Sequence, residues 1–126
     1  MSITPRRQFG DNSEALGAQY LEQKGYVILA RNYQKPWGEI DIIAKDGEVI
    51  VFAEVKANSK NFGAEFSPEV RVNPKKISNI IKTASLYLEY ELRRTDCEWR
   101  IDIVSITFHD NTPTIEHFEN IAEAYS

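Results

Sequence analysis

The sequence is poor in residues that cross-link a chain or anchor it in a membrane. Its 126 residues include one cysteine and two histidines, so Cys97 lacks a partner for an internal disulfide. His109 and His117 provide no zinc-ligand spacing. No stretch approaches the roughly eighteen apolar residues of a membrane span, and no apolar segment follows Arg6 and Arg7 as in a signal peptide. These absences predict a cytoplasmic protein without membrane association.

Positive charge is also scarce overall, but it is concentrated in one segment. A formal net charge of -4 argues against a protein that coats nucleic acid non-specifically. Between residues 56 and 82, however, six basic residues stand against two acidic ones, a local charge of +4. Such a segment can contact phosphates, although a solvated loop and helix surface explains it equally well. The candidate nucleic-acid contacts within it are Lys60, Arg71, Lys75 and Lys76.

The length and the 42% hydrophobic content predict a single domain over residues 1–126, with flexible ends at 1–10 and 120–126. Asp11 and Glu14 form a capping box that predicts a helix from Asp11 to Gly25. A second helix is expected over 73–92, beginning at Asn73-Pro74. Strands are expected over 26–33, 38–45, 48–56 and 99–108, with a short edge strand over 114–118. A strand, a helix and a following strand favour a parallel pairing through a right-handed crossover.

The segment from Gly38 to Lys56 predicts a hairpin with Asp46-Gly47 as a two-residue turn. Pairing Lys45 with Glu48 places Asp41 opposite Phe52. Because directly opposed residues share a side of the sheet, one face is expected to carry Glu39, Asp41, Ile43, Ile50, Phe52, Glu54 and Lys56. The other face is expected to carry Ile40, Ile42, Ala44, Val49, Val51, Ala53 and Val55. Apolar residues on both faces indicate a central strand pair covered on both sides.

Two acids on the first face suggest a metal site. Diagonal neighbours such as Asp41 and Glu54 lie within roughly 7 to 8 Å at the backbone, so both carboxylates can reach one divalent cation. Two buried acids need such a cation, or a shifted pKa, because they repel each other and lose hydration. Lys56 either pairs with Glu54 or orients an attacking water. The alternative is a solvated strand face with an ordinary surface pair.

Several motifs resemble those of the YraN-like family of small bacterial proteins, which are related to archaeal Holliday junction resolvases. The resemblance rests on Gly38-Glu39-Ile40-Asp41 followed by Phe52-Ala53-Glu54-Val55-Lys56, with support from Ser13-Glu14, Ala18 to Leu21, Gly25-Tyr26, Ile28 to Asn32, Pro74-Lys75-Lys76 and Arg100-Ile101-Asp102. It implies the restriction-endonuclease-like (PD-(D/E)xK) α/β fold. In that fold a helix, three strands, a helix and one or two strands build a central mixed sheet flanked by helices.

The resemblance also implies a metal-dependent endonuclease acting on DNA, at branched structures and as a homodimer. Asp41 and Glu54 would hold Mg²⁺ or Mn²⁺ with the Val55 carbonyl, Lys56 would position the attacking water, and Glu14 would match the first-helix acid of the superfamily. Glu39 and Asp102 match family positions in a supporting role, or else form salt bridges with Arg31 or Arg100. Two further hypotheses are a non-catalytic nucleic-acid-binding or adaptor protein that uses residues 56–82, and a purely structural salt-bridge network of the acids with Lys56.

Overall fold

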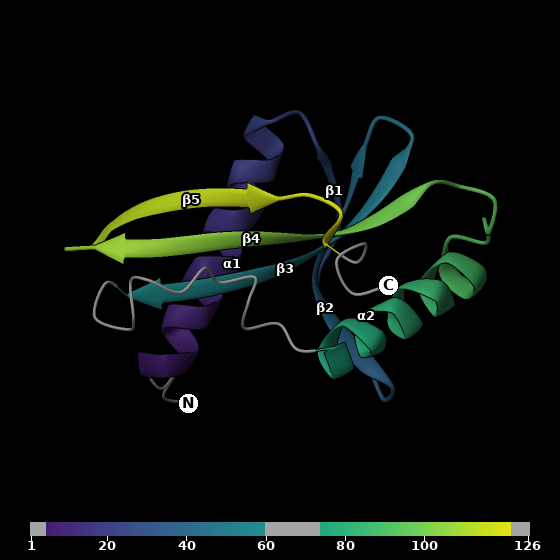
Figure 1. Ribbon diagram of the computed structural model, residues 1–126, viewed down its shortest axis with the longest axis horizontal. Coiled ribbons are helices and arrows are strands. Elements are labelled where there is room, and N and C mark those ends of the chain that lie inside the picture. The colour runs from purple at the N-terminus through teal and green to yellow at the C-terminus, as the bar shows by residue number, and fades with distance from the viewer. Residues whose placement is uncertain (1–4, 60–73, 122–126) are drawn as a thin grey trace.

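The computed structural model describes residues 5–59 and 74–121, with side chains described over 12–57 and 74–121. It is an α/β structure with one five-stranded mixed sheet (Figure 1). The elements in chain order are α1 (Pro5–Gln23), β1 (Val27–Lys35), β2 (Gly38–Asp46), β3 (Val49–Ser59), α2 (Pro74–Leu86), a π-helical segment η2 (Tyr87–Glu91), β4 (Trp99–His109) and β5 (Thr112–Phe118). This confirms the predicted order of helices and strands.

The strands follow one another across the sheet in chain order, β1-β2-β3-β4-β5. The pairs β1–β2, β2–β3 and β4–β5 are antiparallel, whereas β3 and β4 run parallel. A parallel pair cannot be joined by a tight turn, and α2 lies on the crossover that connects these two strands. The predicted parallel pairing is therefore confirmed.

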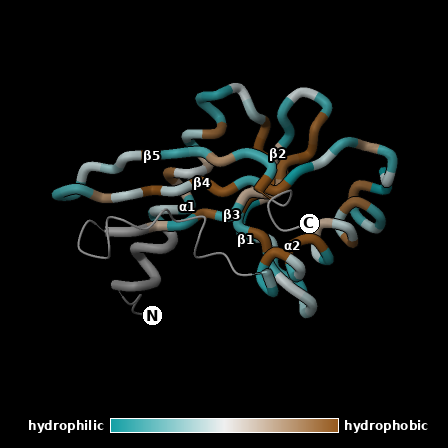
Figure 2. The backbone as a smooth tube through the Cα atoms, viewed as in Figure 1, coloured by the Kyte–Doolittle hydropathy of each residue, from teal (hydrophilic) through white to brown (hydrophobic). Residues whose placement is uncertain are grey.

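Each face of the sheet is covered by one helix, and each helix seals its own apolar core. Side chains of α1 pack with Ile42, Val51 and Val104 on one face. Side chains of α2 pack with Ile43 and Phe52, among others, on the opposite face. Along the central strands, hydrophobic stretches alternate with hydrophilic ones (Figure 2). Neighbouring residues of β3 therefore point into different cores, as the strand period of two requires.

The register of the β2–β3 hairpin differs from the prediction. Asp46 pairs with Val49 and Ile43 with Phe52, so Gly47 and Glu48 form the turn. Gly47 takes a φ of +60°, a left-handed conformation that glycine adopts without steric cost. Each residue's partner moves by two positions, an even number, so the predicted faces of Ile43, Ile50 and Phe52 are unchanged.

Ile40 was assigned to the wrong face. It was expected on the side of Ile42 and Ala44, but it packs in the core under α2 with Ile43. The alternation is interrupted between Ile40 and Ile42, where β2 stops pairing with β3 and continues against β1 alone. A strand released from one neighbour can twist without breaking a ladder on that side, and local sequence does not show where this release occurs.

Two boundaries also need correction. The first helix begins at Pro5, six residues before the predicted start at Asp11, so residues 5–10 are helical rather than an arm. Proline suits the first position of a helix, where its missing N–H is not needed. At the other end, Ile121 is 8% exposed and packs in the α2 core, so the ordered chain extends past the predicted start of a flexible tail at residue 120. No helix among the described residues is long and apolar enough to cross a membrane.

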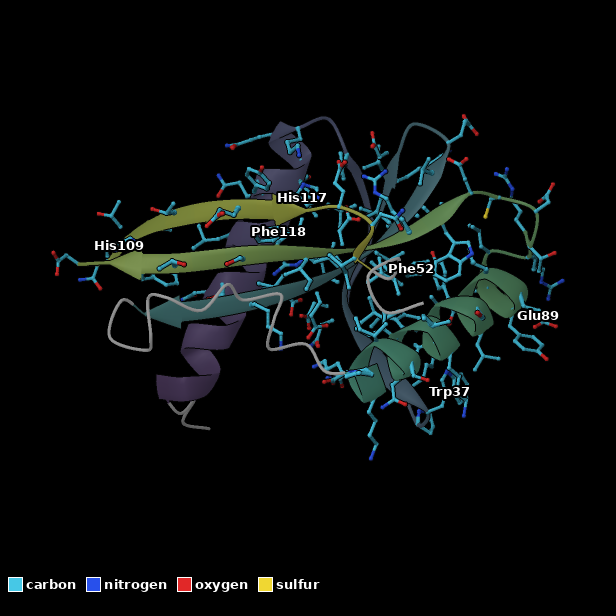
Figure 3. The ribbon with its side chains drawn as sticks, in the orientation of Figure 1. Trp37, Phe52, Glu89, His109, His117 and Phe118 are labelled. Carbon is cyan, nitrogen blue, oxygen red and sulfur yellow. The ribbon has the colours of Figure 1, made fainter. Side chains whose placement is uncertain are left out.

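The turn between β1 and β2 lies tightly against α2 at Gly38. A Cβ atom at this position would collide with the hydroxyl oxygen of Thr83, a residue that is itself fully buried. Trp37, directly before it, stays 44% exposed beside α2 (Figure 3). Trp37 is thus only partly packed, and Gly38 makes the close approach to α2.

This contact predicts a coupled pair of substitutions. Gly38→Ala should lower the free energy of unfolding by about 2 kcal/mol, because the added methyl group overpacks the contact with Thr83. In a Thr83→Ala background the same change should cost clearly less, since the nearest remaining atom lies at 3.5 Å. Urea unfolding of the four proteins in a double-mutant cycle measures the coupling. An equal cost of Gly38→Ala in both backgrounds would contradict the contact.

Candidate metal centre

The predicted site lies at a fork in the sheet. The ladder between β2 and β3 ends at the pair Ile42–Ala53. Beyond it, β2 remains paired with β1 as far as Gly38, while β3 remains paired with β4 as far as Ser59. The two strands therefore separate, as Figure 1 shows. Asp41 and Glu54 are the next residues on the two arms of this fork.

At the fork, the side chain of Asp41 supplies the hydrogen-bond acceptor that the β2–β3 ladder no longer provides. Its Oδ2 atom accepts a hydrogen bond of 2.8 Å from the backbone N–H of Val55. In a β-strand the N–H and C=O groups of one residue point toward the same neighbouring strand. The carbonyl of Val55 is therefore directed toward the fork as well, on the side where the carboxylate of Asp41 lies.

The environment of Asp41 disfavours its ionised form. Burial raises its pKa, the negative charge of Glu54 raises it further, and the total shift carries the pKa to about 7 from a reference value of 3.8. The hydrogen bond from Val55 and the charge of Lys76 act in the opposite direction. The carboxylates are thus close enough for their charges to interact, which is the clustering that the strand pattern predicted for Asp41 and Glu54.

Glu54 is 7% exposed, and its partner is not the expected one. Its Oε1 atom lies 2.9 Å from Nζ of Lys76 in the first turn of α2, whereas no ion pair joins it to Lys56. Burial lowers the pKa of Lys76, but its hydrogen bond to Glu54 and the nearby charges of Glu54, Asp41 and Glu39 raise it by more. Sequence reasoning had assigned Lys76 only to phosphate contacts.

Lys56 follows Glu54 by two residues on β3, so the alternation of the strand places it on the same face. Its side chain makes neither a hydrogen bond nor an ion pair with another described residue. Its partner in the parallel ladder is Ser105 of β4, which is 1% exposed. The Oγ atom of Ser105 has no hydrogen-bond partner within the part of the chain that the structure describes. No local sequence signal marks Ser105, because only the β3–β4 register brings it beside Lys56.

Glu14 reaches the fork from α1, on the opposite face of the sheet. Its charge contributes to the raised pKa of Asp41, and its Oε1 atom lies 3.9 Å from Nε of Arg31. Since the helix begins at Pro5, Glu14 does not belong to an N-terminal capping box. The structure therefore removes the capping role that the sequence pattern assigns to Glu14 and leaves its charge within electrostatic range of Asp41.

The remaining basic candidates divide into two groups. Lys75 is exposed in the first turn of α2, next to Lys76. Lys60 and Arg71 lie outside the described residues. Cations in the first turn oppose the helix dipole, and a phosphate arriving at this N-terminus would relieve the conflict.

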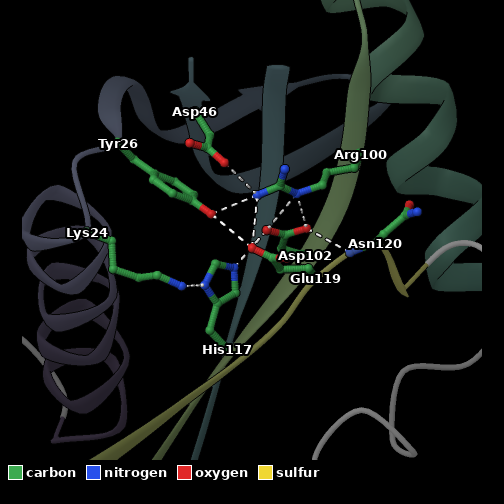
Figure 4. Close-up of polar contacts among 8 residues, drawn as sticks. All are labelled: Lys24, Tyr26, Asp46, Arg100, Asp102, His117, Glu119 and Asn120. Atoms are coloured by element: carbon green, nitrogen blue, oxygen red, sulfur yellow. Dashed lines mark hydrogen bonds and ion pairs between the residues drawn. The ribbon is translucent and has the colours of Figure 1, made fainter. Parts of the chain in front are cut away.

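Asp102 lies away from this site, on the α1 face, within a closed network of polar groups (Figure 4). It is fully buried and accepts hydrogen bonds from Arg100 Nε at 3.1 Å and from the backbone N–H of Asn120 at 2.9 Å. His117 Nε2 approaches its other oxygen at 2.7 Å. The proposed salt bridge between Asp102 and Arg100 is thus present, and Asp102 is not part of the fork.

His117 is oriented by a second cation. Its Nδ1 atom lies 2.8 Å from Nζ of Lys24. Because an ammonium only donates, Nδ1 accepts this hydrogen bond, and Nε2 carries the hydrogen that is donated to Asp102. Burial alone raises the pKa of Asp102, but the hydrogen bonds from His117, Asn120 and Arg100 lower it by more.

Ligand atoms of Asp102, His117 and Glu119 come within 4.8 Å of one another, a spacing that a metal ion could use. His117 already bonds to Asp102, and the carboxylates of Asp102 and Glu119 both contact the guanidinium of Arg100, whose NH2 group lies 3.4 Å from Glu119. Arg100 also reaches Tyr26 and Asp46. The group is therefore a salt-bridge network with its own cations in place.

The fold and the fork together define an α/β protein with carboxylates gathered where two central strands separate. The chain matches the family described as "Uncharacterised protein family UPF0102" over residues 13–106, and it belongs to that family. It is 44% identical over 115 residues to a UPF0102 protein of Syntrophomonas wolfei, covering 90% of this chain and 96% of that one. A UPF0102 protein of Carboxydothermus hydrogenoformans is 40% identical over 119 residues, covering 94% and 98%. The resemblance to the YraN-like family is confirmed.

The raised pKa of Asp41 predicts a pH-dependent stability difference. Between pH 4 and pH 7 the native state holds the Asp41 proton that the unfolded chain releases, so this residue reduces stability as the pH rises through that window. Asp41→Asn cannot ionise, so its stability relative to wild type should increase by on the order of 2 to 4 kcal/mol from pH 4 to pH 8. Urea unfolding in a metal chelator measures this difference. A difference independent of pH would refute the assigned pKa.

The Asp102 network predicts a structural rather than a metal-binding phenotype. Asp102→Asn should reduce the free energy of unfolding by about 3 kcal/mol, because it leaves the largely buried charge of Arg100 without its main partner. The exposed Asp96→Asn serves as the matched control and should change stability by less than about 0.5 kcal/mol. Affinity for Mn²⁺ should stay at the wild-type value in both variants. Loss of metal affinity without loss of stability in Asp102→Asn would place this acid in a metal site.

Proposed function

We propose that the protein is a divalent-metal-dependent endonuclease that hydrolyses DNA phosphodiester bonds at branched structures. The observation that supports this proposal is the pair of interacting carboxylates at the fork, with Glu54 buried and Asp41 held by the N–H of Val55. Two acids this close in a desolvated position need positive charge to remain ionised. Membership of this family does not by itself assign an activity, so the chemistry of these residues supports the proposal.

The residues at the fork fit a hard divalent cation. The carboxylates of Asp41 and Glu54 and the carbonyl of Val55 are all oxygen ligands, which Mg²⁺ and Mn²⁺ prefer. A nearby cation favours the ionised form of a carboxyl group, so a divalent ion at the fork would offset the burial and the charge of Glu54 that raise the pKa of Asp41. When bound, such an ion supplies charge that stabilises the transferring phosphoryl group and makes water a better nucleophile.

The protein's own side chains would complete the reaction. The ammonium group of Lys56, on the face of Glu54, donates hydrogen bonds and can hold an attacking water by its oxygen. Glu14 adds a third carboxylate from the α1 side. The N-terminus of α2 with Lys75 offers partial and full positive charge to the DNA backbone. A homodimer would bring two such sites to the two strands that must be cut at a junction.

The test is metal binding followed by cleavage. Calorimetric titration of Mn²⁺ should give binding to wild type and none to the Asp41→Asn, Glu54→Gln double variant. On a four-way DNA junction, wild type with Mn²⁺ should release nicked strands. Lys56→Ala should retain metal binding and lose about 100-fold or more in cleavage rate, the usual contribution of a group that positions or deprotonates the nucleophile.

Glu48→Gln is the matched control for the Asp41→Asn, Glu54→Gln double variant. Glu48 is an exposed acid at the tip of the same hairpin, and its replacement also removes negative charge. This control variant should bind metal and cleave as wild type does. Absence of Mn²⁺ binding to wild type, with and without the junction, would overturn the proposal. Metal-independent binding of the junction without cleavage would instead identify a nucleic-acid-binding adaptor on this fold.

A further inference from the structure

Lys76 connects α2 to the fork by a direct ion pair. Its Nζ atom lies 2.9 Å from Oε1 of Glu54, and the two side chains are 39% and 8% exposed. The carboxylate is therefore almost enclosed, while the ammonium still has access to solvent. Among the described residues, Lys76 is the only lysine or arginine in ion-pair contact with either Asp41 or Glu54.

The oxygen that contacts Lys76 is one that a metal ion at the fork would use. A carboxylate accepts only, and Oε1 of Glu54 already faces a full positive charge at contact distance. Asp41 commits one of its two oxygens to Val55, which leaves the other for a ligand. An ammonium and a divalent ion cannot both contact Oε1 of Glu54, because their mutual repulsion at such a distance is large.

We propose that Lys76 is a positioning residue of the candidate metal site, in which it serves as the resident counter-ion of Glu54 and competes with the divalent cation. Metal binding moves the ammonium away from Oε1. Since Lys76 stands in the first turn of α2, the displaced group lies at the helix N-terminus, where a DNA phosphate gives it a new partner. This inference rests on the proposed function and adds the group that couples metal binding to DNA binding.

Competition between Lys76 and the metal ion predicts that removing the charge of Lys76 has opposite effects on Mn²⁺ affinity without and with DNA. Without DNA, Lys76→Met should bind Mn²⁺ roughly 3- to 10-fold more tightly than wild type, the factor expected when a partly exposed ion pair no longer has to be broken. With DNA, wild type should gain metal affinity, because the phosphate takes over the ammonium, and coupling between two ligands is reciprocal. Lys76→Met should lose most of this gain.

The experiment is calorimetric titration of Mn²⁺ at pH 8 into four proteins, alone and with a phosphorothioate four-way junction that resists cleavage. Lys75→Met is the matched control for the titrations without DNA, because it removes the same charge from the adjacent exposed position without touching Glu54. Lys76→Arg retains a cation of similar reach and tests whether charge restores the wild-type behaviour. Both should stay within about 2-fold of wild type in the absence of DNA.

The outcomes separate this inference from the proposed function. The competition is supported if Lys76→Met, and neither of the other two variants, binds Mn²⁺ more tightly than wild type without DNA, and if the gain in its Mn²⁺ affinity on adding the junction is reduced. If wild type binds Mn²⁺ and Lys76→Met binds it equally or more weakly, the competition is wrong and the metal site stands. If Lys75→Met tightens binding as much as Lys76→Met, the effect is general charge and the specific role of Lys76 is overturned. If no protein binds Mn²⁺ in either condition, the proposed function fails and the inference fails with it.

Discussion

The hydrogen bond between the N–H of Val55 and the carboxylate of Asp41 is the interaction on which the fork depends. A backbone donor that leaves a sheet ladder needs another acceptor, since an unpaired buried N–H is costly. Asp41 supplies that acceptor from its side chain, so β2 can separate from β3 directly after the Ile42–Ala53 pair. The separation creates the opening at which Glu54 from the sheet and Lys76 from α2 meet. One hydrogen bond thus links the topology of the sheet to the chemistry of the site.

The two faces of the sheet carry buried acids in opposite electrostatic states. On the α1 face, Asp102 is surrounded by donors, and they lower its pKa despite its complete burial. On the α2 side, burial and the charges of acidic neighbours raise the pKa of Asp41 to about 7, and a single backbone donor, the N–H of Val55, acts against them. Groups with satisfied charges stabilise a fold, whereas a shortage of positive charge is a common property of sites that bind a cation. This contrast distinguishes the structural network of Asp102 from the candidate site around Asp41.

Much of the architecture could be predicted from periodicity and turn chemistry. The glycine after Asp46 indicated the hairpin, Asn73-Pro74 indicated the start of the second helix, and apolar residues on both strand faces indicated a sheet covered on both sides. The predictions failed where local rules compete with tertiary packing. The turn moved by one residue, Ile40 changed faces at the fork, and α1 started at Pro5 because a helix that packs against a sheet can include residues of weak propensity.

The sequence by itself determined the order of the helices and strands and the place of the β2–β3 hairpin, because these depend on contacts between near neighbours along the chain. Only the tertiary structure decided which cation meets Glu54. Lys56 is two residues away along the strand, yet Lys76, from a helix twenty-two positions later in the numbering, makes the ion pair. Side chains two apart on a strand point the same way but extend in parallel from a rigid backbone. A helix packed across the sheet can instead bring its side chains directly onto the strand, and no local pattern specifies that approach.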